Sequence, residues 1–166
     1  MSGFVLDLAT LRPGAEWLEV EAGARELDLS EEQWPGPIRG RLRVDRTGDR
    51  VTVHGTVSAT ARLECVRCLE RFDPALEVPL DVFADRSGTG RHPEDEEVLE
   101  RDHEMAFHDG RNLDLRDFAR EALLLEVPIT PRCREDCRGL CPQCGANLNE
   151  GSCPHVSVAA HAPHHD

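Results

Sequence analysis

Alternation of apolar and polar residues is the clearest pattern in the first half of the chain. From Ile38 to Asp45, apolar or small residues occupy every second position, and three arginines stand between them. After a turn at 47–49 the alternation resumes at Val51 and continues to Cys65. A period of two is that of a half-buried strand, and two such runs joined by a short turn form an antiparallel hairpin. The sequence therefore predicts a sheet with one face turned toward a core.

Shorter stretches on either side of this hairpin add further elements. Strands are expected over residues 4–8 and 17–22, with Trp17 anchoring the core, and a third alternating run covers residues 72–82. Residues 30–33 read Ser-Glu-Glu-Gln, which predicts a capping box and a single helical turn. The first half of the chain therefore consists mainly of strands.

One longer helix is predicted after these strands, from Leu115 to Glu126. Asp114 precedes it and can cap its first backbone N–H groups, and Pro128 and Pro131 end it. Its apolar face at helical spacing consists of Leu115, Phe118, Ala119, Ala122 and Leu125. Because an apolar face needs an apolar partner, we expect the helix to cover the sheet. The predicted fold class is α+β, an antiparallel β-sheet covered by one main helix.

Seven cysteines concentrate in two places and indicate metal binding. Cys65 and Cys68 form a C-x2-C pair that the strand pattern places at a hairpin tip, and the other five lie within residues 133–155. Cysteine thiolates in close pairs are typical of structural zinc, and an odd number fits a disulfide framework poorly. With one histidine they make eight ligands, namely Cys65, Cys68, Cys133, Cys137, Cys141, Cys144, Cys153 and His155. We therefore predict two structural zinc ions that form a C-terminal zinc-knuckle clasp on the sheet.

Two ways of sharing these ligands remain open. In the first, the last four ligands of the chain form one site and the first four form the other. In the second, the knuckles 65/68 and 141/144 share one ion, as in a zinc ribbon, and the other four ligands hold the second. Loop-closure entropy favours the first scheme by only about 0.5 kcal/mol. We prefer the first scheme, and in both schemes the closed ligand sets predict structural rather than catalytic ions.

The chain is strongly acidic, because 19 basic residues, all of them arginine, stand against 32 acidic ones, for a net charge of −13. Such a chain does not bind nucleic acid through its overall charge, so RNA contact would need local basic clusters. One cluster is the outer face of the first long strand, with Arg39, Arg41 and Arg43. A second flanks the cysteines and consists of Arg62, Arg67, Arg71, Arg132, Arg134 and Arg138. These arginines either contact RNA or offset the charge of the thiolates.

The expected organisation has three parts. Residues 1–132 form an α+β core domain with an acidic loop at 85–104, and residues 133–155 form a zinc-binding segment packed on the hairpin tip. Residues 156–166 form a disordered His-rich tail. The sequence shows no signal peptide and no run of ~20 apolar residues, so a cytoplasmic protein without a membrane span is expected.

No motif indicates an enzyme, a catalytic residue or a small-molecule substrate. A P-loop and a nucleophile elbow are absent from the sequence. His92-Pro93-Glu94 with a later C-x2-C pair resembles the signature of zinc deaminases, but Glu64 and Leu140 stand where that signature has proline. Neither pair follows a strand and opens a helix, as a thioredoxin-like redox motif would. The expectation is a non-enzymatic protein.

Longer stretches carry a resemblance to a known family. The chain reads L-E-C-V-R-C-L-E-R-F at 63–72, L-D-L-R-D-F-A-R-E-A-L-L-L-E-V-P-I at 113–129, and C-R-E-D-C-R-G-L-C-P-Q-C-G-A-N-L-N-E-G-S-C at 133–153. This order resembles the YceD family, the large ribosomal RNA subunit accumulation proteins. The resemblance implies a cytoplasmic, non-enzymatic factor for 23S rRNA accumulation and large-subunit assembly in bacteria and plastids. It also implies a metal-ligand role for the seven cysteines; at position 155 this chain has His, where Cys also suits the pattern.

Two functions follow from these observations. The first is a ribosome-assembly factor that contacts 23S rRNA or its precursor, or a large-subunit ribosomal protein, through the two arginine clusters. The second is a zinc-stabilised protein–protein adaptor that does not contact RNA, which the net charge of −13 favours. Ultraviolet crosslinking separates the two.

Overall fold

The structure is a computed structural model that describes residues 3–88 and 105–155. The chain divides into two compact units. We call them the sheet unit, which comprises Met1–Ala61 and Pro74–Val127, and the cysteine unit, which comprises Arg62–Asp73 and Pro128–Asp166. Most of the expected acidic loop, residues 89–104, and the expected His-rich tail, residues 156–166, lie outside the described residues.

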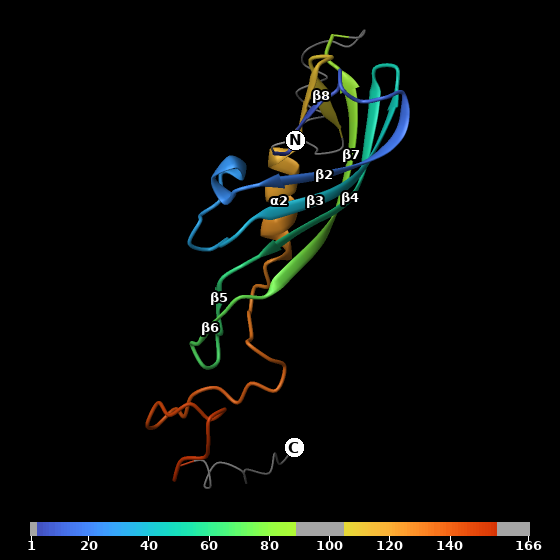
Figure 1. Ribbon diagram of the computed structural model, residues 1–166. Coiled ribbons are helices and arrows are strands. Elements are labelled where there is room, and N and C mark those ends of the chain that lie inside the picture. Colours follow the sequence, from blue (N-terminus) through green and yellow to red (C-terminus); the bar gives the residue numbers. More distant parts are fainter. Residues whose placement is uncertain (1–2, 89–104, 156–166) are drawn as a thin grey trace. The chain divides into compact units, whose positions relative to one another are not determined.

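A five-stranded sheet in the order β2-β3-β4-β7-β8 forms most of the sheet unit (Figure 1). Four long strands are antiparallel neighbours, namely β2 (Gly14–Ala22), β3 (Ile38–Thr47), β4 (Arg50–Thr60) and β7 (Ala75–Arg86). The last strand, β8 (Ala106–His108), runs parallel to β7. The sheet is therefore mixed, whereas the sequence predicted a purely antiparallel one. The parallel strand was not predicted because three residues are too few for an alternating pattern to be recognised.

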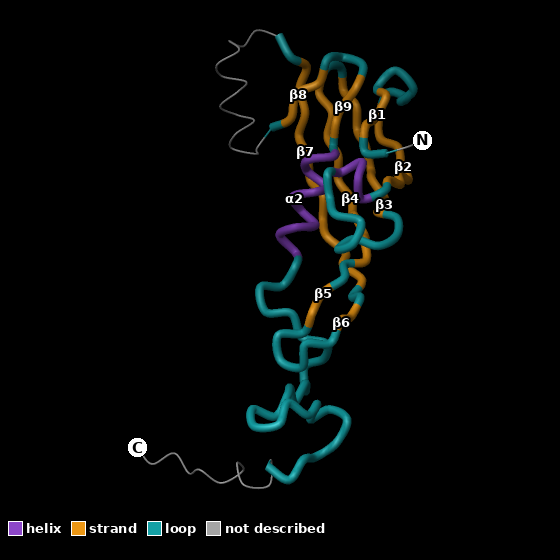
Figure 2. Tube along the Cα trace, turned by 90° about the vertical axis from the view of Figure 1, so that its left-hand side faces the viewer, coloured by secondary structure: helices purple, strands orange, loops and turns teal. Residues whose placement is uncertain are grey.

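Small elements complete the two units. In the sheet unit, β1 (Val5–Asp7) pairs with β9 (Asn112–Asp114), as Figure 2 shows, and a 3-10 turn, η1, spans Ala24–Leu27. In the cysteine unit, β5 (Leu63–Glu64) and β6 (Arg71–Phe72) form a short hairpin. None of the described helices has the length and the apolar composition needed to cross a bilayer.

The core of the sheet unit follows the predicted alternation. In β3, Ile38, Leu42 and Val44 are at most 1% exposed, whereas the arginines between them are exposed. Helix α2 (Arg116–Glu126) packs against β7 and β4 and buries Ala119 and Leu123 (Figure 1). The α+β class and the single main helix on the sheet are thus confirmed for the described residues.

The expectation about the core tryptophan needs correction, whereas the expected early turn forms. Trp17 is 60% exposed, because the β2–β3 register pairs it with Arg43 and so places it on the outer face of the sheet. The buried tryptophan is Trp34, which is 1% exposed. The expected single helical turn forms at Ser30, because the Trp34 N–H donates to the Ser30 carbonyl at 2.9 Å and the Ser30 Oγ accepts the backbone N–H of Gln33 at 3.4 Å.

The buried face of α2 also differs from the expected one. The helix begins at Arg116, whose backbone N–H donates to the Asp114 carboxylate at 3.0 Å. Leu125 is 80% exposed, whereas Leu123 is fully buried. The buried positions recur every four residues from Leu115, and this spacing places Leu125 on the opposite side of the helix. The expected face included the wrong leucine.

Candidate metal centres

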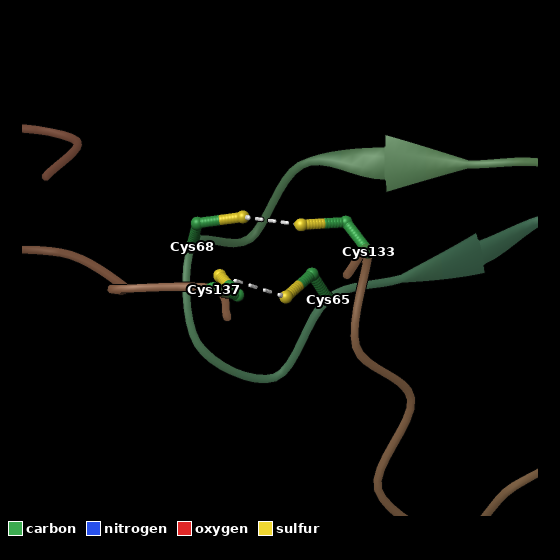
Figure 3. A group of neighbouring side chains, drawn as sticks. All are labelled: Cys65, Cys68, Cys133 and Cys137. Atoms are coloured by element: carbon green, nitrogen blue, oxygen red, sulfur yellow. Dashed lines mark hydrogen bonds between the residues drawn. The ribbon is translucent and has the colours of Figure 1, made fainter. Parts of the chain in front are cut away.

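The hairpin of the cysteine unit presents its two cysteines from a tight turn. The chain reverses between β5 and β6 through a hydrogen bond from the Leu69 N–H to the Cys65 carbonyl at 2.9 Å. Leu69 adopts a left-handed backbone, with φ of 60°, which closes the turn. Figure 3 shows the sulfurs of Cys65 and Cys68 pointing toward those of two further cysteines, Cys133 and Cys137.

Two hydrogen bonds bring the later segment to this hairpin. The Val66 N–H donates to the Pro131 carbonyl at 2.9 Å, just before the third cysteine of the group. The Arg67 guanidinium donates to the Cys137 carbonyl at 2.8 Å. The hairpin therefore holds the backbone on both sides of the 133–137 segment. We call the four cysteines collected here site 1, namely Cys65, Cys68, Cys133 and Cys137.

Site 1 has the dimensions of a tetrahedral thiolate centre. The Sγ–Sγ distance is 3.7 Å between Cys65 and Cys137 and 3.6 Å between Cys68 and Cys133 (Figure 3). All four sulfurs lie within 4.8 Å of one another. A tetrahedral zinc ion with Zn–S bonds of about 2.3 Å holds its sulfurs about 3.8 Å apart. The cluster can therefore hold a metal ion with little rearrangement of its side chains.

Site 1 is also the interior of the cysteine unit. Cys65, Cys68 and Cys137 are 0 to 4% exposed. Among the described residues of the unit, the other buried ones are Leu63, Gly139 and Cys141. Half of the buried positions are therefore site 1 cysteines, and this unit has little apolar core apart from its potential ligands.

The second group lies further along the chain, and we call it site 2. It consists of Cys141, Cys144, Cys153 and His155, whose ligand atoms also lie within 4.8 Å of one another. Its knuckle is closed by a hydrogen bond from the Gly145 N–H to the Cys141 carbonyl at 2.8 Å, and Gly145 has a φ of 73° that glycine adopts without strain. Three thiols and one imidazole suit zinc, and the exposure of Cys144 and His155 makes this site the more open one.

Local hydrogen bonds prepare some of these thiols for a cation. The backbone N–H groups of Cys144 and Gln143 lower the pKa of Cys141 to about 6. At Cys65, burial raises the pKa, but three backbone N–H groups together outweigh it and bring the pKa to about 6. In contrast, burial and the neighbouring thiols raise the pKa of Cys133 to about 12. The thiols of site 1 are thus too close to ionise together without a cation, which is the condition that a divalent metal relieves.

The structure places all eight expected ligands in the two groups. Its grouping is that of the first of the two sharing schemes, in which the last four ligands stay together. Sequence reasoning missed the polar residues around the ligands, chiefly Asn147 and Asn149 in the loop between Cys144 and Cys153. The only signal for them was the N-L-N sequence inside this loop.

The arginines of the outer sheet face are largely occupied by neighbours within the sheet. Arg39 forms an ion pair with Glu21, with an N–O distance of 2.8 Å. The Arg41 guanidinium lies 5.1 Å from the ring centroid of Trp17 and makes a cation–π contact. Arg43 is exposed and forms no ion pair with another described residue. The outer face of the sheet around these three arginines therefore carries less net positive charge than the sequence suggests.

The arginines of the cysteine unit fall into two groups. Three contact their own surroundings: Arg62 forms a forked pair with Asp73 at 3.1 Å, Arg67 bonds the Cys137 carbonyl, and Arg134 lies 3.8 Å from Asp136. The other three are exposed and form no side-chain ion pair within the described part of the chain, namely Arg71, Arg132 and Arg138. Within residues 3–88 and 105–155, these three arginines are therefore the ones whose side chains have no ionic partner.

Comparisons with known proteins place these features in context. A family model described as "Large ribosomal RNA subunit accumulation protein YceD" matches residues 53–165. A protein of Mycobacterium tuberculosis (strain H37Rv), named as uncharacterised, is 37% identical over 143 residues, which are 82% of this chain and 58% of that protein. A maize protein named "Large ribosomal RNA subunit accumulation protein YCED homolog 1, chloroplastic" is 25% identical, over 88% of this chain and 57% of that protein. The chain thus spans somewhat more than half the length of these relatives. No solved structure matches the chain.

Proposed function

Because this chain belongs to the YceD family, we propose that it is a non-enzymatic factor for 23S rRNA accumulation and large ribosomal subunit assembly. The observation that carries the proposal is the extent of the family match, because residues 53–165 include all eight ligands of the two sites. The maize relative carries the ribosomal RNA function in its name. The protein would act in the cytoplasm, as a binding factor rather than a catalyst.

Zinc is the metal that we propose for both sites. Four thiolates at site 1, and three thiolates with one imidazole at site 2, are ligand sets of structural zinc. In this role zinc supplies cohesion to a unit with few buried apolar side chains, and every ligand position is filled by protein. The site residues would then hold the partner-binding surface in place without taking part in a reaction.

The exposed arginines of the cysteine unit are the proposed contact with 23S rRNA or its precursor. In the described residues of this unit, 62–73 and 128–155, six arginines stand against six acidic residues, whereas the rest of the chain has thirteen against twenty-six. The unit is therefore neutral before metal and thiolates are counted, while the remainder carries −13. Arginine can pair with phosphates and stack on bases, so the three arginines that form no ion pair with a described residue can engage RNA where the rest of the chain repels it.

One observation favours the second candidate function, a protein–protein adaptor without RNA contact. The outer face of the sheet mixes both charges, because Glu21 pairs with Arg39 and Glu19 lies opposite Arg41 in the register. Seven thiolates with two zinc ions also add a net charge of about −3 to the cysteine unit. A mixed, partly aromatic face suits a protein partner, such as a large-subunit ribosomal protein, better than a phosphate backbone.

Ultraviolet crosslinking in cells, followed by sequencing of the attached RNA, tests the two functions. We expect 23S rRNA adducts on the unaltered chain and at least about a fivefold loss when Arg71 and Arg132 are both changed to alanine. The reason is that each arginine–phosphate contact contributes on the order of 1 kcal/mol or more. The matched control changes Arg25 and Arg116 to alanine, which removes the same charge from ion-paired arginines of the sheet unit.

The control variant is expected to crosslink as the unaltered chain does. Absence of RNA adducts from the unaltered chain, together with co-purification of a large-subunit ribosomal protein, would decide for the adaptor. Equal loss of adducts from both double variants would show that net charge, rather than the arginines near the cysteines, governs RNA contact.

A further inference from the structure

A hydrogen bond joins the loop of site 2 to a ligand of site 1. The side-chain amide of Asn149 donates from Nδ2 to the sulfur of Cys137 at 3.3 Å. Its Oδ1 accepts the backbone N–H of Arg138, the next residue after that ligand, at 2.8 Å. Asn149 is half-buried and therefore makes both contacts in partial shelter from water. A residue from the loop between two members of site 2 thus contacts the sulfur of a site 1 cysteine and the backbone next to it.

Other residues of the loop bond to the hairpin and to the segment that carry the site 1 cysteines. Asn147 Nδ2 donates to the Glu70 carboxylate of the hairpin at 2.9 Å, and Asn147 Oδ1 accepts both the backbone and side-chain N–H groups of Asn149 at 3.0 Å. The Leu148 N–H donates to the Gly139 carbonyl at 2.9 Å. The loop therefore lies along the segment that carries Cys137, and it holds Asn149 in position.

The ends of this loop are determined by site 2. Residues 145–152 lie between Cys144 and Cys153, two ligands of the same group. A metal ion bound there would tie the two ends together through its bonds to both sulfurs. A closed loop of eight residues has fewer conformations than an open one, so less entropy is lost when Asn149 docks on Cys137.

We propose that Asn149 couples the two metal sites, so that each site binds its ion more tightly when the other is filled. This inference rests on the two-zinc function proposed above. A filled site 2 presents Asn149 to Cys137, and the N–H donor stabilises the charge on the metal-bound sulfur. Coupling between two binding equilibria is reciprocal, so a filled site 1 strengthens site 2 by the same factor. Asn149 is a positioning residue and not a ligand.

A double-mutant cycle in the full chain measures this coupling. Cys153→Ser empties site 2, and Asn149→Ala removes the link while leaving all eight ligands in place. Loss of a partner that hydrogen-bonds a metal ligand typically weakens metal affinity by 10- to 100-fold. We therefore expect Cys153→Ser to weaken site 1 by about tenfold or more. In the Asn149→Ala background the same change should weaken site 1 by no more than about twofold, within the usual error of additivity.

The measurement is a titration with cadmium or cobalt against a competing chelator. Cadmium-113 resonances and the cobalt sulfur-to-metal absorption distinguish a four-thiolate site from a site with three thiolates and one imidazole, so each affinity is read separately. Asn149→Asp is a second variant that still accepts the Arg138 N–H but cannot donate to sulfur, and it should behave as Asn149→Ala does. Gln143→Ala is the matched control, because Gln143 is exposed within the site 2 knuckle and its side chain makes no hydrogen bond to a described residue.

The outcomes separate the inference from the function on which it rests. A chain that binds no metal at these cysteines would overturn the proposed zinc function. A chain that binds two ions, with a site 1 affinity that Cys153→Ser leaves unchanged, would overturn the coupling alone. Coupling that persists in both Asn149 variants would show that other contacts link the two sites. Loss of both ions from both variants would show that Asn149 is required for folding. Either result contradicts the proposal.

Discussion

Removal of bound metal is expected to unfold the cysteine unit and to leave the sheet unit folded. The described part of the cysteine unit contains only two short strands, and four of its six buried residues are cysteines. A chain segment of this size rarely folds on a hydrophobic core alone. Structural zinc supplies an apparent binding free energy of about 10–16 kcal/mol in small zinc domains, and that energy is also the folding energy of the domain.

Hydrogen exchange measured with and without a strong chelator tests this expectation. The backbone N–H groups of Cys65, Val66 and Cys141 bond within the cysteine unit and should lose their protection when metal is removed. The sheet unit should keep its protection in β3, β4 and β7, because its buried apolar residues do not depend on metal. The Ala61 N–H, which donates to the Pro74 carbonyl at 3.1 Å within the sheet unit, should also stay protected. Retained protection at Cys65 in the metal-free chain would contradict the expectation.

Gly55→Ala is expected to destabilise the sheet unit strongly. Gly55 lies in β4 opposite Leu42 of β3. A Cβ atom added at Gly55 would collide with the carbonyl oxygen of Arg41 and lie 2.9 Å from the Leu42 Cα. These are backbone atoms of a central strand pair, so the clash is relieved only by displacing β3. We expect a loss of about 3 kcal/mol or more in the free energy of unfolding and a melting temperature lower by roughly 10 °C.

Urea unfolding of the metal-loaded chain measures this loss. The matched control is Thr56→Ser, one residue further along β4, where the side chain is exposed on the other face of the sheet. The control should remain within about 1 kcal/mol of the unaltered chain. A Gly55→Ala chain as stable as the control would show that the β3–β4 pair is spaced more widely than the structure indicates.

The long strands could be predicted because each has one buried and one exposed face. In β3 this contrast is complete, since arginines alternate with residues that are nearly fully buried. The period of two in β2 already places Trp17 on the same face as Glu19 and Glu21. The pairing of Trp17 with Arg43 agrees with this outer position. Strands of three residues, such as β8 and β9, have no readable period at all.

The candidate ligands were predictable from residue type, and their surroundings were not. Cysteine pairs at close spacing have few other uses in a chain of this kind, so the sequence identified all eight candidate ligands. The contact of Asn149 with Cys137 depends on how residues 145–152 fold, and asparagine is common in loops for other reasons. The ion pair between Arg39 and Glu21 likewise depends on the strand register, which the sequence pattern does not determine.

The most direct test of the account is X-ray absorption at the zinc edge on the zinc-loaded chain, combined with its metal content. The account predicts two zinc ions per chain that share seven sulfur ligands and one imidazole nitrogen, with Zn–S bonds of about 2.3 Å. Substituting His155 by alanine should remove the nitrogen contribution from the zinc-loaded chain and leave the four-sulfur coordination of site 1 in place. A single zinc ion per chain, or an average of two or fewer sulfurs per ion, would contradict the assignment of these eight residues to two closed sites.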